Sequence, residues 1–259
     1  MGLQCVALSI WSENMRNIKL ILEYDGARYF GFQRQPRQVT IQEVLEKALS
    51  RLLNRVTKIQ SASGRTDTGV HALCQVVNFK TAHAMDLKKM QRGLNGLLPR
   101  DVAVRQIEEV PREFHSRYSA RSKVYEYRIW NDPVRSPLKG KQSWHVPYAL
   151  NLRRIRQGMR TLSGKHDFRS FCAAHSAVKD TVRTIRFFSL KRMGSLLVFH
   201  IEADGFLYHM VRNLVGTLVD LGRDRWTLEG LKQALRACDR KLTGPTAPAE
   251  GLTLIRVTY

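Results

Sequence analysis

Gly64-Arg65-Thr66-Asp67-Thr68-Gly69-Val70-His71 stands just before an apolar run at residues 76–79, and the rest of the chain is arranged around this loop and the strand that the run predicts. Glycine reaches backbone angles that other residues avoid, so the two glycines permit a turn that holds the Asp67 carboxylate in a fixed direction. The alternative is an ordinary surface turn, because Asp and Thr side chains bond nearby backbone N–H groups and Arg65 could be a solvated charge. The loop lacks the motifs of a P-loop and of a dinucleotide site, which disfavours nucleoside triphosphates and NAD as ligands.

The segment that leads to this loop predicts a strand, an aromatic loop and a helix. Residues 18–24 alternate mainly between apolar and polar side chains, which indicates a strand with one buried face. Phe30-Gly31-Phe32-Gln33-Arg34-Gln35-Pro36 combines aromatic, polar and basic side chains, so it either contacts bases and phosphates or anchors itself to the core through its phenylalanines. Thr40 and Glu43 match a capping box, and apolar residues recur at helical spacing over residues 41–52.

The segment that follows the loop completes a β-α-β-β-α-β order or one close to it. Asp86 is placed to cap a helix over residues 87–97, and Pro99 is expected to end it. Residues 102–107 then alternate in the manner of a strand. The first half of the chain therefore reads as one α+β domain.

The pattern breaks at residues 111–116, where we place a domain boundary. The first domain then covers residues 16–112 and carries the Asp67 loop, and the second covers residues 113–259. Residues 1–15 are interpreted as a poorly ordered extension, because they lack the basic start and small-residue cleavage site of a signal peptide.

The second half repeats the alternation of strands and helices. Tyr125 and Tyr127 share one face of a strand at residues 124–129, and residues 131–144 are interpreted as a long, mobile, basic loop. The remaining expected elements are a helix at 152–162, strands at 184–190 and 196–203, helices at 206–221 and 228–237, and a strand at 252–257. This order predicts two related α+β halves that share one mainly antiparallel sheet with flanking helices.

The charge of the chain indicates the class of its partner. Forty-three Lys and Arg residues against 22 Asp and Glu residues give a formal net charge of +21 and a pI near 10.4. The basic residues are spread through the chain, with denser stretches at residues 112–123, 139–141 and 153–160, so the basic surface belongs to the fold and not to a tail. A polyanion is therefore the expected partner, and nucleic acid is the first candidate.

The cysteines and the hydropathy exclude several other classes. Cys5, Cys74, Cys172 and Cys238 lie far apart, which disfavours a zinc ribbon or a disulfide framework and fits a reducing cytoplasm. Cys172 and His175 are three residues apart, but no second pair accompanies them, so a buried thiol is the preferred interpretation. No stretch approaches ~20 consecutive apolar residues, so no membrane span is expected.

Several segments together resemble the tRNA pseudouridine synthase A family. They cover nearly the whole chain from about Arg16 onward in the family's order, and the set is specific although each segment alone is weak evidence. The shared motifs are Glu23-Tyr24-Asp25-Gly26, Gln33-x-Gln35-Pro36, Gly64-Arg65-Thr66-Asp67-x-Gly69-Val70-His71-Ala72, Gln75-Val76, Leu94-Asn95-x-Leu97-Leu98-Pro99-x-Asp101, Phe114-His115-x-Arg117, Ala120-Arg121-x-Lys123-x-Tyr125-x-Tyr127, His166-Asp167-Phe168-x-Ser170-Phe171, Gly205-Phe206-Leu207-Tyr208-His209-Met210-Val211-Arg212-Asn213-x-Val215-Gly216 and Ala247-Pro248-Ala249-x-Gly251-Leu252.

The resemblance implies a reaction on RNA. A uridine of tRNA is detached at its N-glycosidic bond, rotated and rejoined through carbon 5, with neither a cofactor nor a metal. The implied targets are the uridines at positions 38, 39 and 40 in the anticodon stem-loop. The implied fold is two ferredoxin-like halves, and the implied assembly is a homodimer.

Asp67 matches the essential aspartate of the family. Breaking a glycosidic bond builds positive charge at the sugar carbon, and a carboxylate there can stabilise that charge, attack the carbon as a nucleophile or take a neighbouring proton as a base. The sequence leaves these roles open. Thr68 stands where the family often has alanine, so the loop carries an extra hydroxyl beside an intact catalytic position.

Three other residues match the family's site, and Arg65 is a further candidate. Arg212 matches the arginine that pairs with the aspartate; the alternative, a surface charge, conflicts with its apolar helix, where an unpaired guanidinium is costly. Tyr125 matches the tyrosine that stacks on the flipped uracil and helps to remove the proton at carbon 5, and Leu252 matches the apolar cover of the base's other face. Without the resemblance both are interpreted as core residues. Arg65 is expected to fill the gap in the RNA stem when the target base leaves it, and the alternative is a phosphate contact.

Two other functions compete with this reading. A catalytically silent RNA-binding protein of the same fold would show the same basic surface and aromatic residues, but it has no use for Asp67, Tyr125 and Arg212 together. A related synthase with broader RNA targets would keep all three, and the short chain favours the narrower tRNA role. No acid–base role is assigned to the histidines of the motifs, which are expected to be structural or to contact the backbone: His71, His115, His166 and His209.

Overall fold

The structure is a computed structural model that describes residues 15–173 and 178–259. The chain divides into two units, the first ending at Ala120 and the second beginning at Arg121. The expected N-terminal extension lies outside the described residues except for Met15, and Cys5 and His175 also lie outside them.

The sheet of the first unit is built around β1, Arg16–Tyr24. This strand pairs antiparallel with β3, His71–Thr81, on one side and with β4, Val102–Val110, on the other. A two-residue strand, β2 (Ser61–Ala62), pairs with β3 and gives the order β4-β1-β3-β2. Alternate residues of β1 are buried from Ile18 onward, as its sequence pattern predicts.

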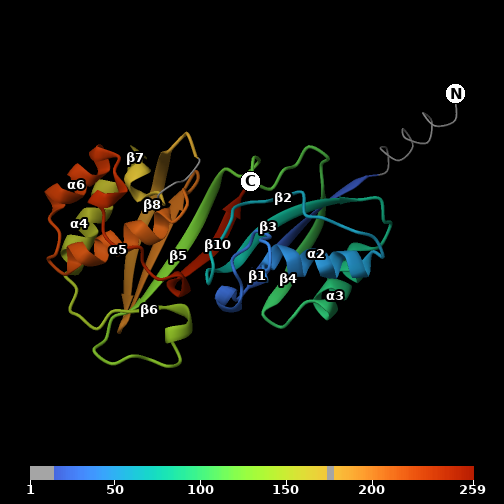
Figure 1. Cartoon of the computed structure of the whole chain (residues 1–259), viewed down its shortest axis with the longest axis horizontal. Helices are drawn as coiled ribbons and strands as arrows, with labels where there is room; N and C mark the ends of the chain where they lie inside the picture. The colour runs from blue at the N-terminus through green and yellow to red at the C-terminus, as the bar shows by residue number, and fades with distance from the viewer. Residues whose placement is uncertain (1–14, 174–177) are drawn as a thin grey trace. The chain divides into compact units, whose positions relative to one another are not determined.

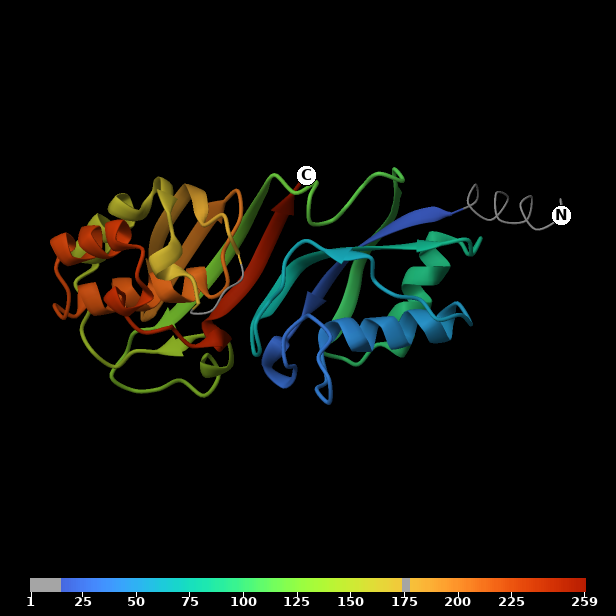
Figure 2. The same ribbon diagram turned by 45° about the horizontal axis from the view of Figure 1, so that its top comes forward.

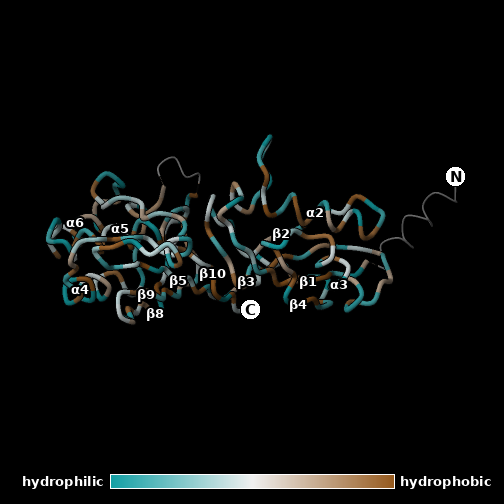
Figure 3. The backbone as a smooth tube through the Cα atoms, turned by 90° about the horizontal axis from the view of Figure 1, so that it is seen from below, coloured by the Kyte–Doolittle hydropathy of each residue, from teal (hydrophilic) through white to brown (hydrophobic). Residues whose placement is uncertain are grey.

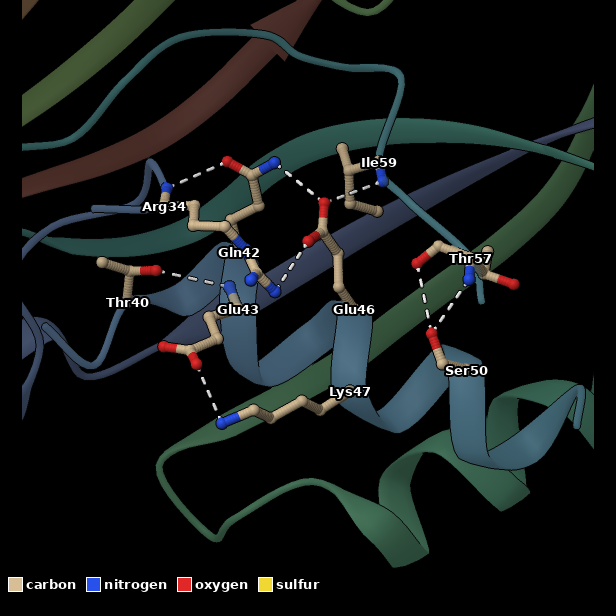
Figure 4. A network of polar contacts seen from close by, with 9 residues as sticks. All are labelled: Arg34, Thr40, Gln42, Glu43, Glu46, Lys47, Ser50, Thr57 and Ile59. Carbon is tan, nitrogen blue, oxygen red and sulfur yellow. Dashed lines mark hydrogen bonds and ion pairs between the residues drawn. The ribbon is translucent and has the colours of Figure 1, made fainter. Parts of the chain in front are cut away.

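Helix α2, Ile41–Leu52, begins and ends where the sequence predicts. Thr40 Oγ1 accepts a hydrogen bond from Glu43 N–H at 3.3 Å, which satisfies one of the backbone donors at the helix start. The Glu43 carboxylate lies 2.8 Å from Lys47 Nζ, one turn further along (Figure 4). The threonine side of the expected capping box is thus present, and the glutamate is engaged in an i,i+4 ion pair.

Helix α3, Leu87–Leu97, also confirms its predicted bounds. Asp86 Oδ1 accepts a hydrogen bond from Lys89 N–H at 3.0 Å, as a capping aspartate should. The helix contacts α2 and β4 (Figure 1). The first unit therefore has the β-α-β-β-α-β order and the 4-1-3-2 strand arrangement of a ferredoxin-like fold.

The second unit repeats this arrangement with additions. Its strands are β5 (Ser122–Trp130), β8 (Val182–Met193), β9 (Leu196–Ala203) and β10 (Leu252–Thr258), in the order β10-β5-β9-β8 with antiparallel pairing throughout. Two short strands are added, β7 (Gly164–Asp167) beside β8 and β6 (Trp144–His145) parallel to β5. The α+β class with mainly antiparallel pairing and flanking helices is therefore confirmed.

The helices of the second unit lie together on one side of its strands (Figures 1 and 2). They are α4 (Leu152–Leu162), α5 (Met210–Gly222) and α6 (Leu228–Ala237). The bounds of α4 and α6 were predicted correctly. The predicted start of α5 at residue 206 was wrong, because His209 adopts a left-handed backbone (φ 62°) that a right-handed helix cannot contain.

The interior of each unit is formed by one face of its strands and the helices above it. Figure 3 shows hydrophobic and hydrophilic residues interleaved along the chain in both units. In the second unit, Leu197, Phe199 and Ile201 on β9 are almost fully buried, and their neighbours across the sheet are Ile129, Tyr127 and Tyr125. Packing of this kind is the main source of the stability of each unit.

The segment at residues 131–144 contains a 3-10 turn, Gly140–Gln142, and bonds to its surroundings. Trp130 Nε1 donates to Val134 O at 3.0 Å, and Asn131 Nδ2 donates to Val146 O at 2.9 Å. The mobility expected for this segment stays a prediction.

Within residues 15–173 and 178–259, none of the helices has the length and apolar character that a membrane crossing requires. In the same part of the chain, Cys74, Cys172 and Cys238 are free thiols, and Cys172 is buried as expected.

Candidate active site

The loop that joins β2 to β3 carries Asp67 and is bonded to the turn that follows β1. Phe32 N–H donates to Thr66 O at 3.0 Å, and Gly69 N–H donates to Tyr29 O at 3.3 Å. These bonds hold the backbone on both sides of Asp67. The side chain of Asp67 is half-buried.

A buried side-chain network supports the same loop from below. Tyr24 Oη and Thr66 Oγ1 are 2.7 Å apart, and Gln75 Nε2 donates to Gly64 O at 2.9 Å. Ser63 Oγ donates to Gln75 Oε1 at 2.6 Å, and Gln75 Nε2 also lies 3.4 Å from Tyr24 Oη. Burial raises the pKa of Tyr24 from 10.0 to about 12, so its hydroxyl stays protonated and able to donate.

Two glycines before the loop allow this close approach. A Cβ on Gly26 would lie 2.0 Å from Val70 O, and a Cβ on Gly31 would lie 2.6 Å from Thr66 O. Gly31 also has φ +80°, which other residues rarely adopt. Since the obstructing atoms belong to the backbone, any side chain at either position would displace the loop that carries Asp67.

Arg65 is exposed and lies between two fixed neighbours. Gly64 is tied through its carbonyl to Gln75, and Thr66 is tied through its hydroxyl to Tyr24. The guanidinium therefore extends from a backbone that is held in place, while its long side chain can move.

The loop ends at His71, which is buried at the start of β3. Its Nδ1 lies 3.2 Å from Gly26 N and 2.9 Å from Asp25 Oδ1. This confirms the expectation that the histidine contacts the backbone. It also fixes the end of the loop to the turn after β1.

The loop with Phe30 and Arg34 is anchored through a buried carboxylate on α2. Glu46 Oε1 accepts from Gln42 Nε2 at 2.9 Å and from Ile59 N–H at 3.1 Å, and Glu46 Oε2 lies 3.1 Å from Arg34 Nη2 (Figure 4). A buried carboxylate is tolerated where it is bonded in this way. Of the two alternatives for this loop, anchoring applies to Phe32, which is buried, whereas Phe30 is exposed.

The second unit holds Tyr125 and Leu252 on neighbouring strands. Cross-strand partners are Leu254 with Tyr125 and Leu252 with Tyr127, so the four side chains share one face of the sheet. Tyr125 is 7% exposed and packs edge-to-face on Phe206, with ring centroids 5.0 Å apart and an interplanar angle of 87°. Phe206 was not predicted as a site residue, although it stands in a quoted family motif.

Arg212 lies on the first turn of α5 and is half-buried. Its Nε donates to Ala247 O at 2.7 Å, and Ala247 N–H donates back to Arg212 O at 3.1 Å. This reciprocal pair fixes the direction of the guanidinium relative to the segment that leads to Leu252.

Arg240 holds the segment at residues 244–247, which leads to Leu252, and it was not predicted from the sequence. Its Nη2 donates to Asn213 Oδ1 at 3.1 Å and to Thr246 Oγ1 at 3.0 Å, and its Nη1 donates to Gly244 O at 2.9 Å. Burial lowers the pKa of this arginine below its usual value. No local pattern marks Arg240, because its partners lie on α5 and on the following loop.

Asp67 and Arg65 thus belong to the first unit, and Tyr125, Arg212 and Leu252 belong to the second. Each set is held by bonds within its own unit.

The sequence matches a family described as tRNA pseudouridine synthase over residues 20–119 and 159–259. The chain belongs to the tRNA pseudouridine synthase family. The tRNA pseudouridine synthase A of Citrifermentans bemidjiense is 44% identical over 246 residues, which cover 95% of this chain and 98% of that protein. The tRNA pseudouridine synthase A of Geobacter sulfurreducens is 45% identical over 245 residues, which cover 95% of this chain and 100% of that protein.

Among solved structures, a chain of a Cbf5-Nop10-Gar1 complex covers 92% of this chain and 49% of its own length. Its sequence identity is 15% and its TM-score 0.39, too low to carry a functional argument.

Membership of the tRNA pseudouridine synthase family makes the chain a member of a group of isomerases that form pseudouridine. The two matched ranges include Asp67, Arg65, Arg212 and Leu252, whereas Tyr125 lies between them.

Proposed function

We propose that this chain isomerises uridine to pseudouridine in tRNA, at positions 38, 39 and 40 of the anticodon stem-loop, and that Asp67 is the essential carboxylate. The assignment of Asp67 rests on the hydrogen bonds that hold its loop in place. A half-buried carboxylate stands on a loop whose neighbours are bonded on both sides and from below. An acid held in this way supplies preorganised charge to a reacting sugar.

In the proposed reaction, the bond between uracil nitrogen 1 and the sugar carbon breaks, and the base rotates. Carbon 5 then bonds to the same sugar carbon. Carbon 5 loses its proton, and nitrogen 1 ends with one, so substrate and product are isomers. Asp67 acts at the sugar, as a nucleophile that forms a transient bond or as a base that takes a neighbouring proton.

Three residues of the second unit are proposed to complete the site. Arg212 is the proposed ion-pair partner of Asp67, because an adjacent guanidinium keeps a carboxylate ionised. Tyr125 is proposed to stack on the extruded uracil and to assist removal of the proton at carbon 5, and Leu252 to cover the other face. Their common sheet face and the tether from Arg212 to Ala247 support this grouping within the unit.

Arg65 is proposed to occupy the gap that the extruded base leaves in the RNA stem.

A homodimer is the proposed assembly. A solution mass of twice 29.8 kDa by light scattering supports it. A mass of 29.8 kDa for the free chain, together with one copy of the chain in the complex with tRNA, contradicts it.

The test of the reaction is tritium release from carbon 5 of uracil in anticodon-arm transcripts. We expect release with the wild-type chain and a loss of at least about 100-fold in Asp67→Asn and Asp67→Ala, as for removal of a catalytic acid–base or nucleophilic group. Asp180→Asn is the matched control, because Asp180 is an exposed acid of the second unit and should leave release unchanged.

Circular dichroism of each variant shows whether it has folded. No release from the wild type would contradict the enzymatic proposal and favour an RNA-binding protein. Equal release from wild type and Asp67→Asn would remove Asp67 from the mechanism. Release from other RNAs at the same rate would indicate a synthase with broader targets.

A further inference from the structure

The last turn of the first unit presents an aromatic ring to solvent. Tyr118 is 77% exposed. Its ring stacks on that of His115, with centroids 4.4 Å apart and an interplanar angle of 28°. The guanidinium carbon of Arg117 lies 5.7 Å from the centroid of the tyrosine ring.

The turn at residues 115–119, which carries the stacked rings, is held by hydrogen bonds among its own residues. His115 Nδ1 accepts from Arg117 N–H at 3.2 Å and from Tyr118 N–H at 3.3 Å. Ser119 N–H donates to His115 O at 2.9 Å, and His115 N–H donates to Ser119 Oγ at 3.2 Å. The imidazole is thereby oriented by the backbone, and it supports one face of the tyrosine ring.

A buried polar network lies under the turn and joins it to β2. Ser116 Oγ is 2.6 Å from Ser61 Oγ, and Ser116 N–H donates to Asn78 Oδ1 at 3.1 Å. Asn78 Nδ2 donates to Asn17 Oδ1 at 2.9 Å, and Asn17 Nδ2 donates to Phe114 O at 2.9 Å. Ser61 begins β2, the strand that leads directly into the Asp67 loop. The turn and the loop therefore share one rigid anchor.

Two other exposed tyrosines can be compared with Tyr118. Tyr208, 55% exposed, also packs on a histidine ring, that of His209, with centroids 4.0 Å apart and an interplanar angle of 35°. Tyr148, 55% exposed, has its ring covered by Arg223, whose guanidinium carbon lies 3.9 Å from the centroid. Tyr118 stacks on the His115 imidazole, has the Arg117 guanidinium at the longer distance of 5.7 Å, and is 77% exposed. In a chain with a net charge of +21, the flat partner that such a ring fits is a nucleobase, because the phosphates beside it are attracted by the same surface.

We propose that Tyr118, supported by His115, is a stacking platform for an unpaired nucleobase of the tRNA substrate, distinct from the uridine that reacts. The identity of the RNA rests on the proposed function. The platform is built before RNA arrives, so stacking requires no rearrangement of the turn. Base stacking on an aromatic side chain accepts any base, and the contact therefore adds affinity and sets register without reading sequence.

The first test measures tRNA affinity in the Asp67→Asn background, where turnover does not change the ligand. With a full tRNA transcript, we expect Tyr118→Ala to weaken binding by about 5- to 150-fold, as for other base-stacking residues. Tyr118→Phe keeps the ring and should bind within about twofold of the parent. Tyr148→Ala is the matched control and should bind as the parent does.

The second test identifies the stacked base with a double-mutant cycle. Single abasic nucleotides are placed in turn through the unpaired regions of the transcript. We expect one position where loss of the base weakens the parent but not the Tyr118→Ala variant, since the two changes remove the same contact. The dependence of affinity on salt should be equal in parent and variant, because no charge is removed.

Four results would overturn the platform. The first is that the effects of Tyr118→Ala and of the abasic nucleotide are additive at every position. The second is that Tyr118→Phe binds tRNA as weakly as Tyr118→Ala, and the third is that Tyr118→Ala changes the salt dependence of affinity. The fourth is that Tyr118→Ala changes the solution mass of the protein and leaves its affinity for tRNA unchanged. Tritium release from the same transcript by the chain with an intact Asp67 tests the reaction separately. If the stacking proposal is wrong, tritium release is still observed. If the proposed reaction is wrong, the double-mutant cycle can still be measured by binding.

Discussion

Tyr24 illustrates how single residues hold the candidate site. The alternation of β1 predicts that its side chain is buried, and it is. The sequence could not show that its hydroxyl reaches Thr66, 42 residues further along, because that contact depends on the pairing of β1 with β3. The catalytic candidate was found from a local motif, but its support comes from long-range bonds.

Arg65 gives the prediction at this scale. Arg65→Ala should lower the rate of tritium release more than it lowers tRNA affinity, because gap filling is needed only once the base has left the stem. Single-turnover rates and binding constants measured on the same transcript separate the two effects. Arg51→Ala removes another exposed arginine of the first unit and should leave the rate unchanged. If Arg65→Ala weakens binding and leaves the single-turnover rate unchanged, Arg65 contacts a phosphate instead.

At the scale of elements, the helices with clear caps were predicted to the residue, and the irregular segments were not. Helices α2, α3 and α6 begin after a Thr or Asp whose side chain accepts from the third residue on. Helix α5 starts without a side-chain cap, so its apolar pattern extended the prediction into the turn before it. The strands β2, β6 and β7 were missed because they are two to four residues long and show no alternation.

The packing of α5 leads to a prediction about glycine. A Cβ on Gly216 would lie 1.8 Å from Pro245 O, in the segment that also bonds Arg212. Alanine has a higher helix propensity than glycine by about 1 kcal/mol, but the clash should outweigh this gain. Gly216→Ala should therefore lower the free energy of unfolding by more than about 1 kcal/mol. Gly96→Ala on α3 is the control, since its Cβ meets nothing within 4 Å and should stabilise by up to about 1 kcal/mol. Urea unfolding of both variants measures this. A stabilised Gly216→Ala would show that the segment is not held against the helix.

For the whole molecule, the sequence predicted two α+β halves with a similar order of elements, and the two units have such an order, with β6 and β7 added in the second. This succeeded because strand and helix periods are local properties. The grouping of the site residues came from family motifs and not from spacing, since Asp67, Tyr125, Arg212 and Leu252 are far apart in the sequence. Residues such as Arg240, which support those motifs from outside, carried no signal.

Buried tyrosines in both units predict how the stability of the molecule depends on pH. Burial raises the pKa of Tyr24 to about 12 and that of Tyr127 well above 10.0. The unfolded chain loses these protons near pH 10 while the folded chain keeps them, so the stabilisation is complete below pH 10 and is lost as the pH rises toward 12. For Tyr24 this amounts to about 2 to 3 kcal/mol.

Thermal unfolding between pH 8 and 12 measures this effect. Tyr24→Phe keeps the ring but cannot ionise, so its melting temperature should fall less steeply above pH 10 than that of the wild type. Parallel curves for the two proteins would show that the pKa of Tyr24 is the same in the folded and the unfolded chain, which would contradict the prediction.

The bonds described for the Asp67 loop draw their partners from the stretch between Tyr24 and Gln75. During synthesis, all of these residues are translated before any residue of β5, α5 or β10. The residues that hold the Asp67 loop are therefore all present in the nascent chain before the second unit is made. The arginine and tyrosine proposed to work with Asp67 are translated later, as parts of the second unit.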